Sequence, residues 1–124
     1  MLNGGEQVLY RELQARLQGR PVMLAPKVRV LDALGPDRLG ALSRQERDYA
    51  FRAHLDMVVV ELGGFKPVAA VELDGATHEK DPLTMARDRL KNGICEKVGL
   101  PLLWVRWGDW GALSALDGVV GRAG

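Results

Sequence analysis

The stretch that decides the fold is LDMVVVEL at residues 55–62, followed by the turn Gly63-Gly64-Phe65 and then by PVAAVELD at residues 67–74. Both runs are rich in apolar and β-branched residues and are too short for typical helices, so each predicts a buried strand. A glycine-rich connection between two such runs is typical of a β-hairpin. We therefore expect an antiparallel hairpin at the centre of the fold.

The register of this hairpin decides where its acidic residues lie. We expect it to close with Leu62 opposite Lys66. In that register Asp56 lies directly across from Glu72, and such opposed residues have Cβ atoms about 5 Å apart on one face of the sheet. Asp74 is two positions beyond Glu72 and therefore points to the same face. A slip of one residue would separate Asp56 from Glu72, so the predicted cluster depends on this register.

Two carboxylates at this separation repel each other. At about 4 Å and an effective dielectric constant near 20, the repulsion amounts to about 4 kcal/mol. A partly buried pair is relieved either by a proton, which raises the pKa of one acid, or by a divalent cation. Oxygen ligands suit Mg²⁺ or Mn²⁺. Acids that are merely solvated at the end of a strand would give the same pattern, so the residues alone leave both interpretations open.

The remaining elements surround the hairpin. We expect a helix over residues 5–18 behind an Asn3–Glu6 capping box, and a second capping box from Ser43 to Glu46. The other expectations are a strand over 22–30 bent at Pro26, a loop over 31–42, a helix from Ser43 to about 51, a helix from 82 to about 98 closed by Gly99, a strand over 100–107 and a terminal helix over 110–121. This order predicts an α/β domain with a central mixed sheet of about four strands flanked by helices. The last strand, which follows a helical crossover, should run parallel to residues 67–74.

Further polar residues follow the hairpin and are candidates to complete a site. His78 lies just past the second strand, where an imidazole can act as a general acid or base. A loop histidine is also a common surface residue. Asp88 and Lys91 are three apart and share a helix face. Such a pair can belong to a site, with Asp88 as a supporting acid, although a surface salt bridge is the commoner case.

Three arginines are candidates for nucleic-acid binding. Arg44, Arg47 and Arg87 lie on predicted helices, where they could contact DNA phosphates or simply form solvated helix faces. Trp104 and Cys95 lie among apolar residues, so we expect both in the core.

Composition bounds the remaining function classes. The chain has 124 residues, 47% of them hydrophobic, with a formal net charge of +1, which predicts a single globular domain over residues 1–124. One cysteine excludes a disulfide framework and a cysteine-built zinc site within the chain. No apolar run approaches the roughly 20 residues of a membrane span. The first residues lack a secretory pattern, so we expect a cytoplasmic protein without membrane attachment.

These motifs resemble the PD-(D/E)XK nuclease superfamily. The resemblance is carried by LDMVV at residues 55–59, VELDGxxH at 71–78, RDRxKN at 87–92 and GLPLLWVR at 99–106. It covers most of the chain, from about Glu6 to Arg106. The sequence is similar to a bacterial family of restriction-endonuclease-like domains of unknown function and, around VELDGxxH, to the very-short-patch-repair endonucleases.

The resemblance implies a restriction-endonuclease-like fold and a Mg²⁺- or Mn²⁺-dependent DNA endonuclease, with a homodimer as a further expectation. It implies that Asp56 and Glu72 hold the metal, with Asp74 as a third ligand. It also implies that Glu6 is the supporting acid of the first helix, a residue that equally serves as a helix cap.

The sequence departs from the superfamily at one position. Asp74 stands where the superfamily has its lysine, two residues after the metal-binding glutamate. Asp74, His78 and Lys91 are the candidates to take over that role. The alternative is a nuclease fold without catalysis that binds nucleic acid or a protein partner. The missing lysine and the near-neutral charge motivate this alternative.

Overall fold

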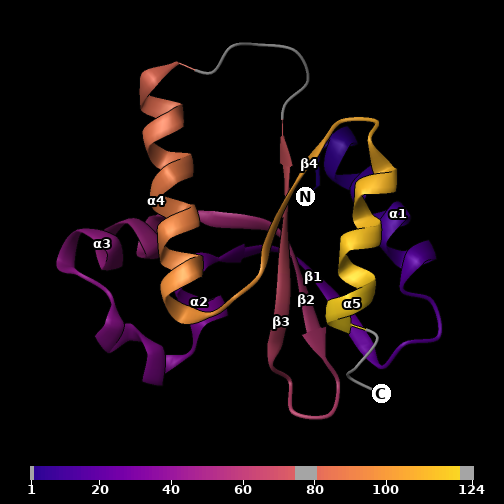
Figure 1. Ribbon diagram of the computed structural model, residues 1–124, viewed down its shortest axis with the longest axis horizontal. Coiled ribbons are helices and arrows are strands. Elements are labelled where there is room, and N and C mark those ends of the chain that lie inside the picture. The colour runs from indigo at the N-terminus through magenta and orange to yellow at the C-terminus, as the bar shows by residue number, and fades with distance from the viewer. Residues whose placement is uncertain (1, 75–80, 121–124) are drawn as a thin grey trace.

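The computed structural model describes residues 2–74 and 81–120. Eleven elements follow one another in this part of the chain (Figure 1). They are α1 (Gly4–Arg16), β1 (Val22–Arg29), α2 (Val30–Leu34), the 3₁₀ helix η1 (Pro36–Ala41), α3 (Arg44–Arg52), β2 (His54–Glu61), β3 (Pro67–Asp74), α4 (Pro82–Val98), β4 (Leu102–Arg106), the 3₁₀ helix η2 (Trp110–Leu116) and α5 (Asp117–Val120).

The four strands form one mixed sheet in the order β1-β2-β3-β4. The pairs β1–β2 and β2–β3 are antiparallel, whereas β3 and β4 are parallel. The parallel pair is joined through α4, because a parallel connection needs a crossover. The predicted four-strand mixed sheet flanked by helices is therefore confirmed.

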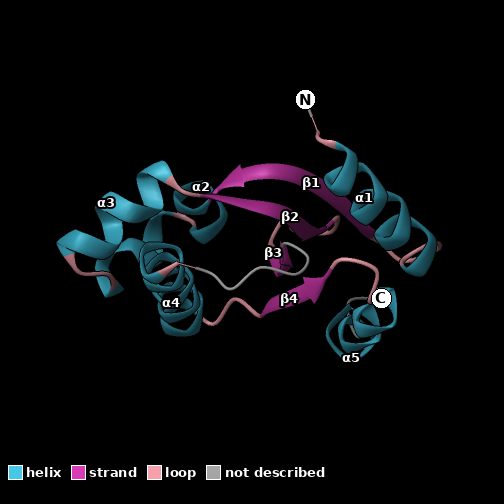
Figure 2. Ribbon diagram, turned by 90° about the horizontal axis from the view of Figure 1, so that it is seen from above, coloured by secondary structure: helices cyan, strands magenta, loops and turns pink. Residues whose placement is uncertain are grey.

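Helices cover both faces of the sheet. Figures 1 and 2 show α2, α3 and α4 on one side and α1 and α5 on the other. Successive side chains of the hairpin point to opposite faces of the sheet, so alternate residues pack against the helices on each side. Val58 and Ala70 pack toward α3 and α4, whereas Val59 and Val71 pack with the leucines of α1. The sheet thus separates two hydrophobic cores.

Strong local signals fix the helices that border the candidate site. Both predicted capping boxes are present, at Asn3–Glu6 and at Ser43–Glu46. Asp81 caps α4 by accepting from Thr84 N at 2.7 Å, and Gly99 ends this helix in the left-handed conformation at φ 71°. Glycine adopts that conformation without the steric penalty of a side chain.

Three expectations about the rest of the chain are wrong. The segment 31–42, expected as a loop, contains most of α2 and all of η1. The terminal helix is mainly the 3₁₀ helix η2. Trp104 is half-buried rather than in the core, and its indole Nε1 donates to Asn92 Oδ1 at 2.6 Å. Cys95, by contrast, is buried as expected.

Within residues 2–74 and 81–120, no helix combines the length and apolar character needed to span a bilayer.

Candidate active site

The candidate site lies where β2 and β3 separate. Their ladder pairs Met57 with Val71 and extends toward the turn. Beyond it, side chains replace the backbone partners, since Asp56 N donates to Glu72 Oε1 at 2.6 Å and Leu73 N donates to Asp56 Oδ2 at 2.7 Å. Each carboxylate therefore accepts a hydrogen bond from the backbone of the opposite strand, which holds the two acids together at the end of the hairpin.

The predicted register is confirmed at the acids and wrong at the turn. Met57 pairs with Val71 as expected, but Val60 pairs with Pro67, and a bulge between Val59 and Val60 absorbs the shift. Glu61 N accordingly donates to Lys66 O at 2.8 Å. A bulge sets two residues of one strand against one of the other. The alternation of apolar residues does not reveal this extra residue, because it holds on both sides of the bulge.

Burial sets the electrostatics of the acid pair. The pKa of Glu72 is raised, first by burial and then by the negative charge of Asp56. The pKa of Asp56 is raised by burial, with a further contribution from the charge of Glu6. Both shifts mean that placing charged carboxylates here is unfavourable unless positive charge accompanies them.

Lys91 supplies positive charge from α4. Its Nζ donates to Glu72 Oε2 at 2.7 Å and to the backbone oxygen of His54 at 2.9 Å. Burial lowers the pKa of Lys91, but the hydrogen bond and charge of Glu72 outweigh burial, so the pKa is raised. Lys91 is therefore a cation at neutral pH. It had been predicted from sequence as a candidate for the missing lysine.

Glu6 approaches the pair from the first turn of α1. It is buried, its Oε1 accepts from Asn3 N at 3.0 Å, and its Oε2 lies 2.9 Å from Lys27 Nζ. Burial alone would raise the pKa of Glu6, but the Asn3 hydrogen bond, Lys27 and a side-chain hydrogen bond with Asp56 together lower it. Glu6 thus serves both as a helix cap and as part of the site.

Lys27 is a site residue that the sequence reasoning missed. It falls between the Pro26–Met57 and Val28–Leu55 pairs, at the ladder position across from Asp56. Its φ of 54° lies in the left-handed region, which is uncommon for a residue other than glycine. The bend expected at Pro26 was the one sequence signal near Lys27. It could not place Lys27 across from Asp56, because β1 and β2 are not joined by a short turn that would fix their pairing.

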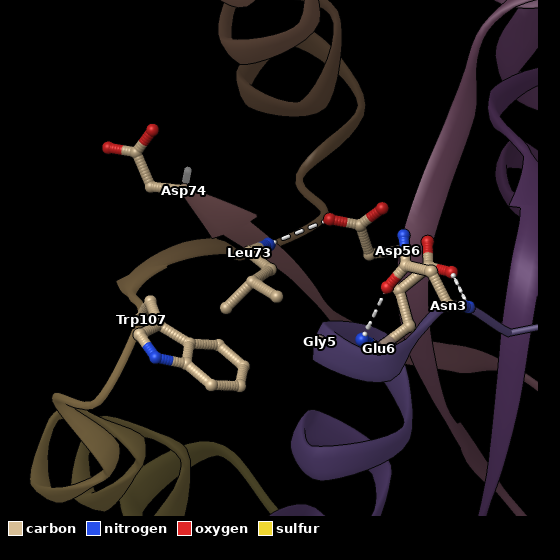
Figure 3. Close-up of a pocket in the computed structure, with 7 residues that line it drawn as sticks. All are labelled: Asn3, Gly5, Glu6, Asp56, Leu73, Asp74 and Trp107. Carbon is tan, nitrogen blue, oxygen red and sulfur yellow. Dashed lines mark hydrogen bonds between the residues drawn. The ribbon is translucent and has the colours of Figure 1, made fainter. Parts of the chain in front are cut away.

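A pocket of about 510 Å³ opens beside these acids, a size that suits a small ligand or part of a larger one. Figure 3 shows its lining residues, which come from α1, the ends of the strands and the segment after β4: Asn3, Gly5, Glu6, Asp56, Leu73, Asp74 and Trp107. In this view the Asp74 carboxylate points away from Asp56. Asp74 also lines a second pocket together with Asp88, Asn92 and Trp104.

The remaining predicted site residues lie in different places. Arg87 lines a pocket that also includes Lys91. Arg44 and Arg47 are exposed on α3 and are not among the residues of that pocket. His78 lies outside the described residues, so the structure does not place it.

The described acids do not form a metal centre with three protein ligands. Among residues 2–74 and 81–120, no group of three or more histidine, cysteine, aspartate or glutamate side chains is arranged to hold a metal ion. Mg²⁺, however, is usually bound through one or two carboxylates and keeps several waters. Asp56 and Glu72 fit that smaller donor set, because each oxygen that accepts one hydrogen bond retains a second lone pair.

Comparison with known proteins adds a family but no function. No curated protein and no solved structure matches the chain. One family model, DUF2726, described as a protein of unknown function, matches residues 1–116. Because that match covers nearly the whole chain, the protein belongs to the DUF2726 family.

Proposed function

We propose that the protein is a divalent-metal-dependent nuclease that hydrolyses phosphodiester bonds in DNA, in the manner of the PD-(D/E)XK enzymes. The observation that carries the proposal is the pairing of Asp56 with Glu72 beside Lys91, with 2.7 Å between Lys91 Nζ and Glu72 Oε2. Two adjacent acids and a buried cation at the end of a hairpin are the residue types that phosphodiester hydrolysis needs.

Asp56 and Glu72 would hold Mg²⁺ or Mn²⁺. A bound ion of this kind polarises the phosphate and lowers the pKa of a water molecule. The raised pKa values of both acids fit this role, because a cation relieves the cost of placing negative charge in a buried site. Asp74 lines the same pocket as Asp56, but its carboxylate points away from Asp56, so the proposed donor set is Asp56 and Glu72 and no longer includes the expected third ligand.

Lys91 would take the place of the superfamily's lysine from a different element. Its raised pKa keeps it protonated, which favours stabilisation of negative charge over acceptance of a proton from water. It is anchored by Glu72 and by the backbone oxygen of His54. Such anchoring holds the cation in place before a substrate arrives, which is how preorganised groups stabilise a transition state. Asp88 is proposed as a supporting acid on the same helix.

The second candidate function is a non-catalytic module that binds nucleic acid or a protein partner. One specific observation favours it: both oxygens of Glu72 already accept hydrogen bonds, from Asp56 N and from Lys91 Nζ. A carboxylate satisfied in this way is stable without a metal ion. The two candidates differ in whether a divalent cation changes what the protein does to DNA.

A nicking assay separates the two candidates. Purified protein is incubated with supercoiled plasmid in Mg²⁺, in Mn²⁺ and in chelator. We expect nicking only with a divalent cation, and no nicking by Asp56→Ala or Glu72→Ala. Glu61→Ala is the matched control, because Glu61 lies at the other end of β2, and it should keep wild-type activity. Equal nicking by all variants would exclude the assigned site, and a lack of nicking by wild type would favour the binding module.

A further inference from the structure

The pocket that includes Arg87 and Lys91 lies between α3 and α4 and is distinct from the pocket beside the acids. It is lined by Tyr49, Arg52, Ala53, His54, Arg87 and Lys91. These residues come from the end of α3, the start of β2 and the middle of α4. Figures 1 and 2 show α3 and α4 side by side on one face of the sheet.

Helical spacing explains why these side chains converge. Tyr49 and Arg52 are three residues apart on α3, and Arg87 and Lys91 are four apart on α4. Residues at those spacings share a helix face. Because the two helices pack against each other, the four side chains meet along the seam between them.

Three cationic side chains line the pocket. They are the two arginines and Lys91, of which Lys91 is paired with Glu72, while the neighbouring acids Asp48 and Asp88 are not part of the lining. The Arg52 side chain is steadied by its Nε, which donates to the backbone oxygen of Asp48 at 3.3 Å. That bond leaves its terminal nitrogens for a ligand. A guanidinium presents a planar fork of donors that matches the oxygens of phosphate.

We infer that this pocket is a phosphate-binding subsite, in which Arg52, Arg87 and Tyr49 bind a phosphate group next to Lys91. Lys91 links the subsite to the acid pair, because two of its three protons go to Glu72 and to His54 O. Among residues 2–74 and 81–120 the third proton has no hydrogen-bond partner, so it can be donated to an anion. The inference rests on the proposed function, since a nucleic-acid strand is the substrate that carries a second phosphate near the one being cleaved. The phosphate is either internal to the strand or a terminal phosphomonoester.

Binding without metal tests the subsite. Single-stranded oligonucleotides with a 5′-hydroxyl or a 5′-phosphate are titrated in chelator and followed by fluorescence anisotropy. Inorganic phosphate serves as competitor against chloride at matched ionic strength. We expect Arg52→Gln and Arg87→Gln each to weaken oligonucleotide binding about tenfold, the loss of one charge-assisted contact. Arg11→Gln is the matched control, because Arg11 is exposed on α1, which lies on the other side of the sheet, and does not line the pocket.

The arms of the experiment separate the sources of the phosphate. A preference for the 5′-phosphate that disappears in Arg52→Gln would identify a terminal phosphate, and equal losses for both oligonucleotides would identify an internal one. A rise in melting temperature with inorganic phosphate but not with chloride, together with no oligonucleotide binding, would keep the subsite and reject DNA as substrate. An equal loss in Arg11→Gln, or no competition by phosphate, would overturn the subsite, whereas the nicking assay alone decides the proposed nuclease activity.

Discussion

Glu72 joins three parts of the chain through one carboxylate. It accepts from Asp56 N of β2 and from Lys91 Nζ of α4, and it belongs to β3 itself. The side chains of the ion pair are only 7% and 11% exposed. Removing one partner of such a pair leaves an uncompensated buried charge. The stability of this region therefore depends on both partners being present.

This dependence predicts the effect of Lys91→Met. We expect the free energy of unfolding to fall by about 3–5 kcal/mol, the usual effect of breaking a buried ion pair. Adding Glu72→Gln should restore much of the loss, because the uncompensated charge is removed. Urea unfolding of wild type, both single variants and the double variant measures the coupling. Additive effects of the two substitutions would contradict a direct interaction.

The raised pKa of Asp56 makes the stability of the folded protein depend on pH. Because its pKa is raised in the folded state, mainly by burial, the folded protein binds the proton more tightly than the unfolded chain. The stabilisation from this proton is fully present below the unfolded pKa and is lost as pH rises through the folded pKa. We therefore expect Asp56→Asn without metal to be more stable than wild type near neutral pH, by a margin that shrinks toward about pH 4.

Thermal unfolding of the two proteins across this pH range checks that prediction. The substitution keeps an oxygen to accept from Leu73 N, so the hydrogen bond at the strand end is a constant in the comparison. If wild type and Asp56→Asn differed in stability by the same amount at every pH, the charge of Asp56 would not be the cause of the difference.

At the scale of elements, the first turn of α1 connects helix stability with the candidate site. Asn3 Oδ1 accepts from Glu6 N at 2.8 Å, and Glu6 Oε1 accepts from Asn3 N at 3.0 Å. We expect Asn3→Ala to destabilise the protein by about 1 kcal/mol through loss of the cap. Chemical denaturation gives this value. Ser43→Ala, in the matching capping box of α3, is the control for a cap that lies away from Glu6.

The capping variants should differ in one further respect. Asn3→Ala keeps the backbone N–H that donates to the Glu6 carboxylate and helps lower its pKa, but it loosens the turn that holds this N–H in place, so the pKa of this carboxyl should rise. NMR titration of the Glu6 side chain measures the change. Ser43→Ala should leave it unaltered, and an equal rise in both variants would point to a general loss of structure.

The elements differ in how far the sequence could predict them. The Asp56–Glu72 pairing was predicted from the strand period of two and from an expected Leu62–Lys66 turn; that turn is wrong, and the bulge between Val59 and Val60 restores the expected register beside the acids. The α2 and η1 segments were missed because Gly35 and Pro36 interrupt any long apolar period. Burial of Val30, Ala33 and Leu34 against the core stabilises α2, and such tertiary packing has no local signature. The position of Lys27 was not predicted either, because it depends on the pairing of β1 with β2, two strands that are not joined by a hairpin.

At the scale of the whole molecule, metal binding should appear as added stability. A ligand that binds only the folded state raises the free energy of unfolding by about 2.7 kcal/mol at a hundredfold excess over its dissociation constant. We expect Mg²⁺ or Mn²⁺ to raise the melting temperature of wild type, and Asp56→Asn to lose the response. Glu61→Ala again provides a control. Equal responses in all three proteins would place the ion elsewhere.

The bulge between Val59 and Val60 has a consequence for how this molecule tolerates change. It decouples the two ends of the hairpin, since the pairing shifts at Val60 while Met57 and Val71 keep their register. An insertion or deletion around Gly63 and Gly64 should therefore be taken up locally, with the acids at the opposite end unmoved. Relatives with hairpins of unequal length can in this way keep the same arrangement of Asp56 and Glu72.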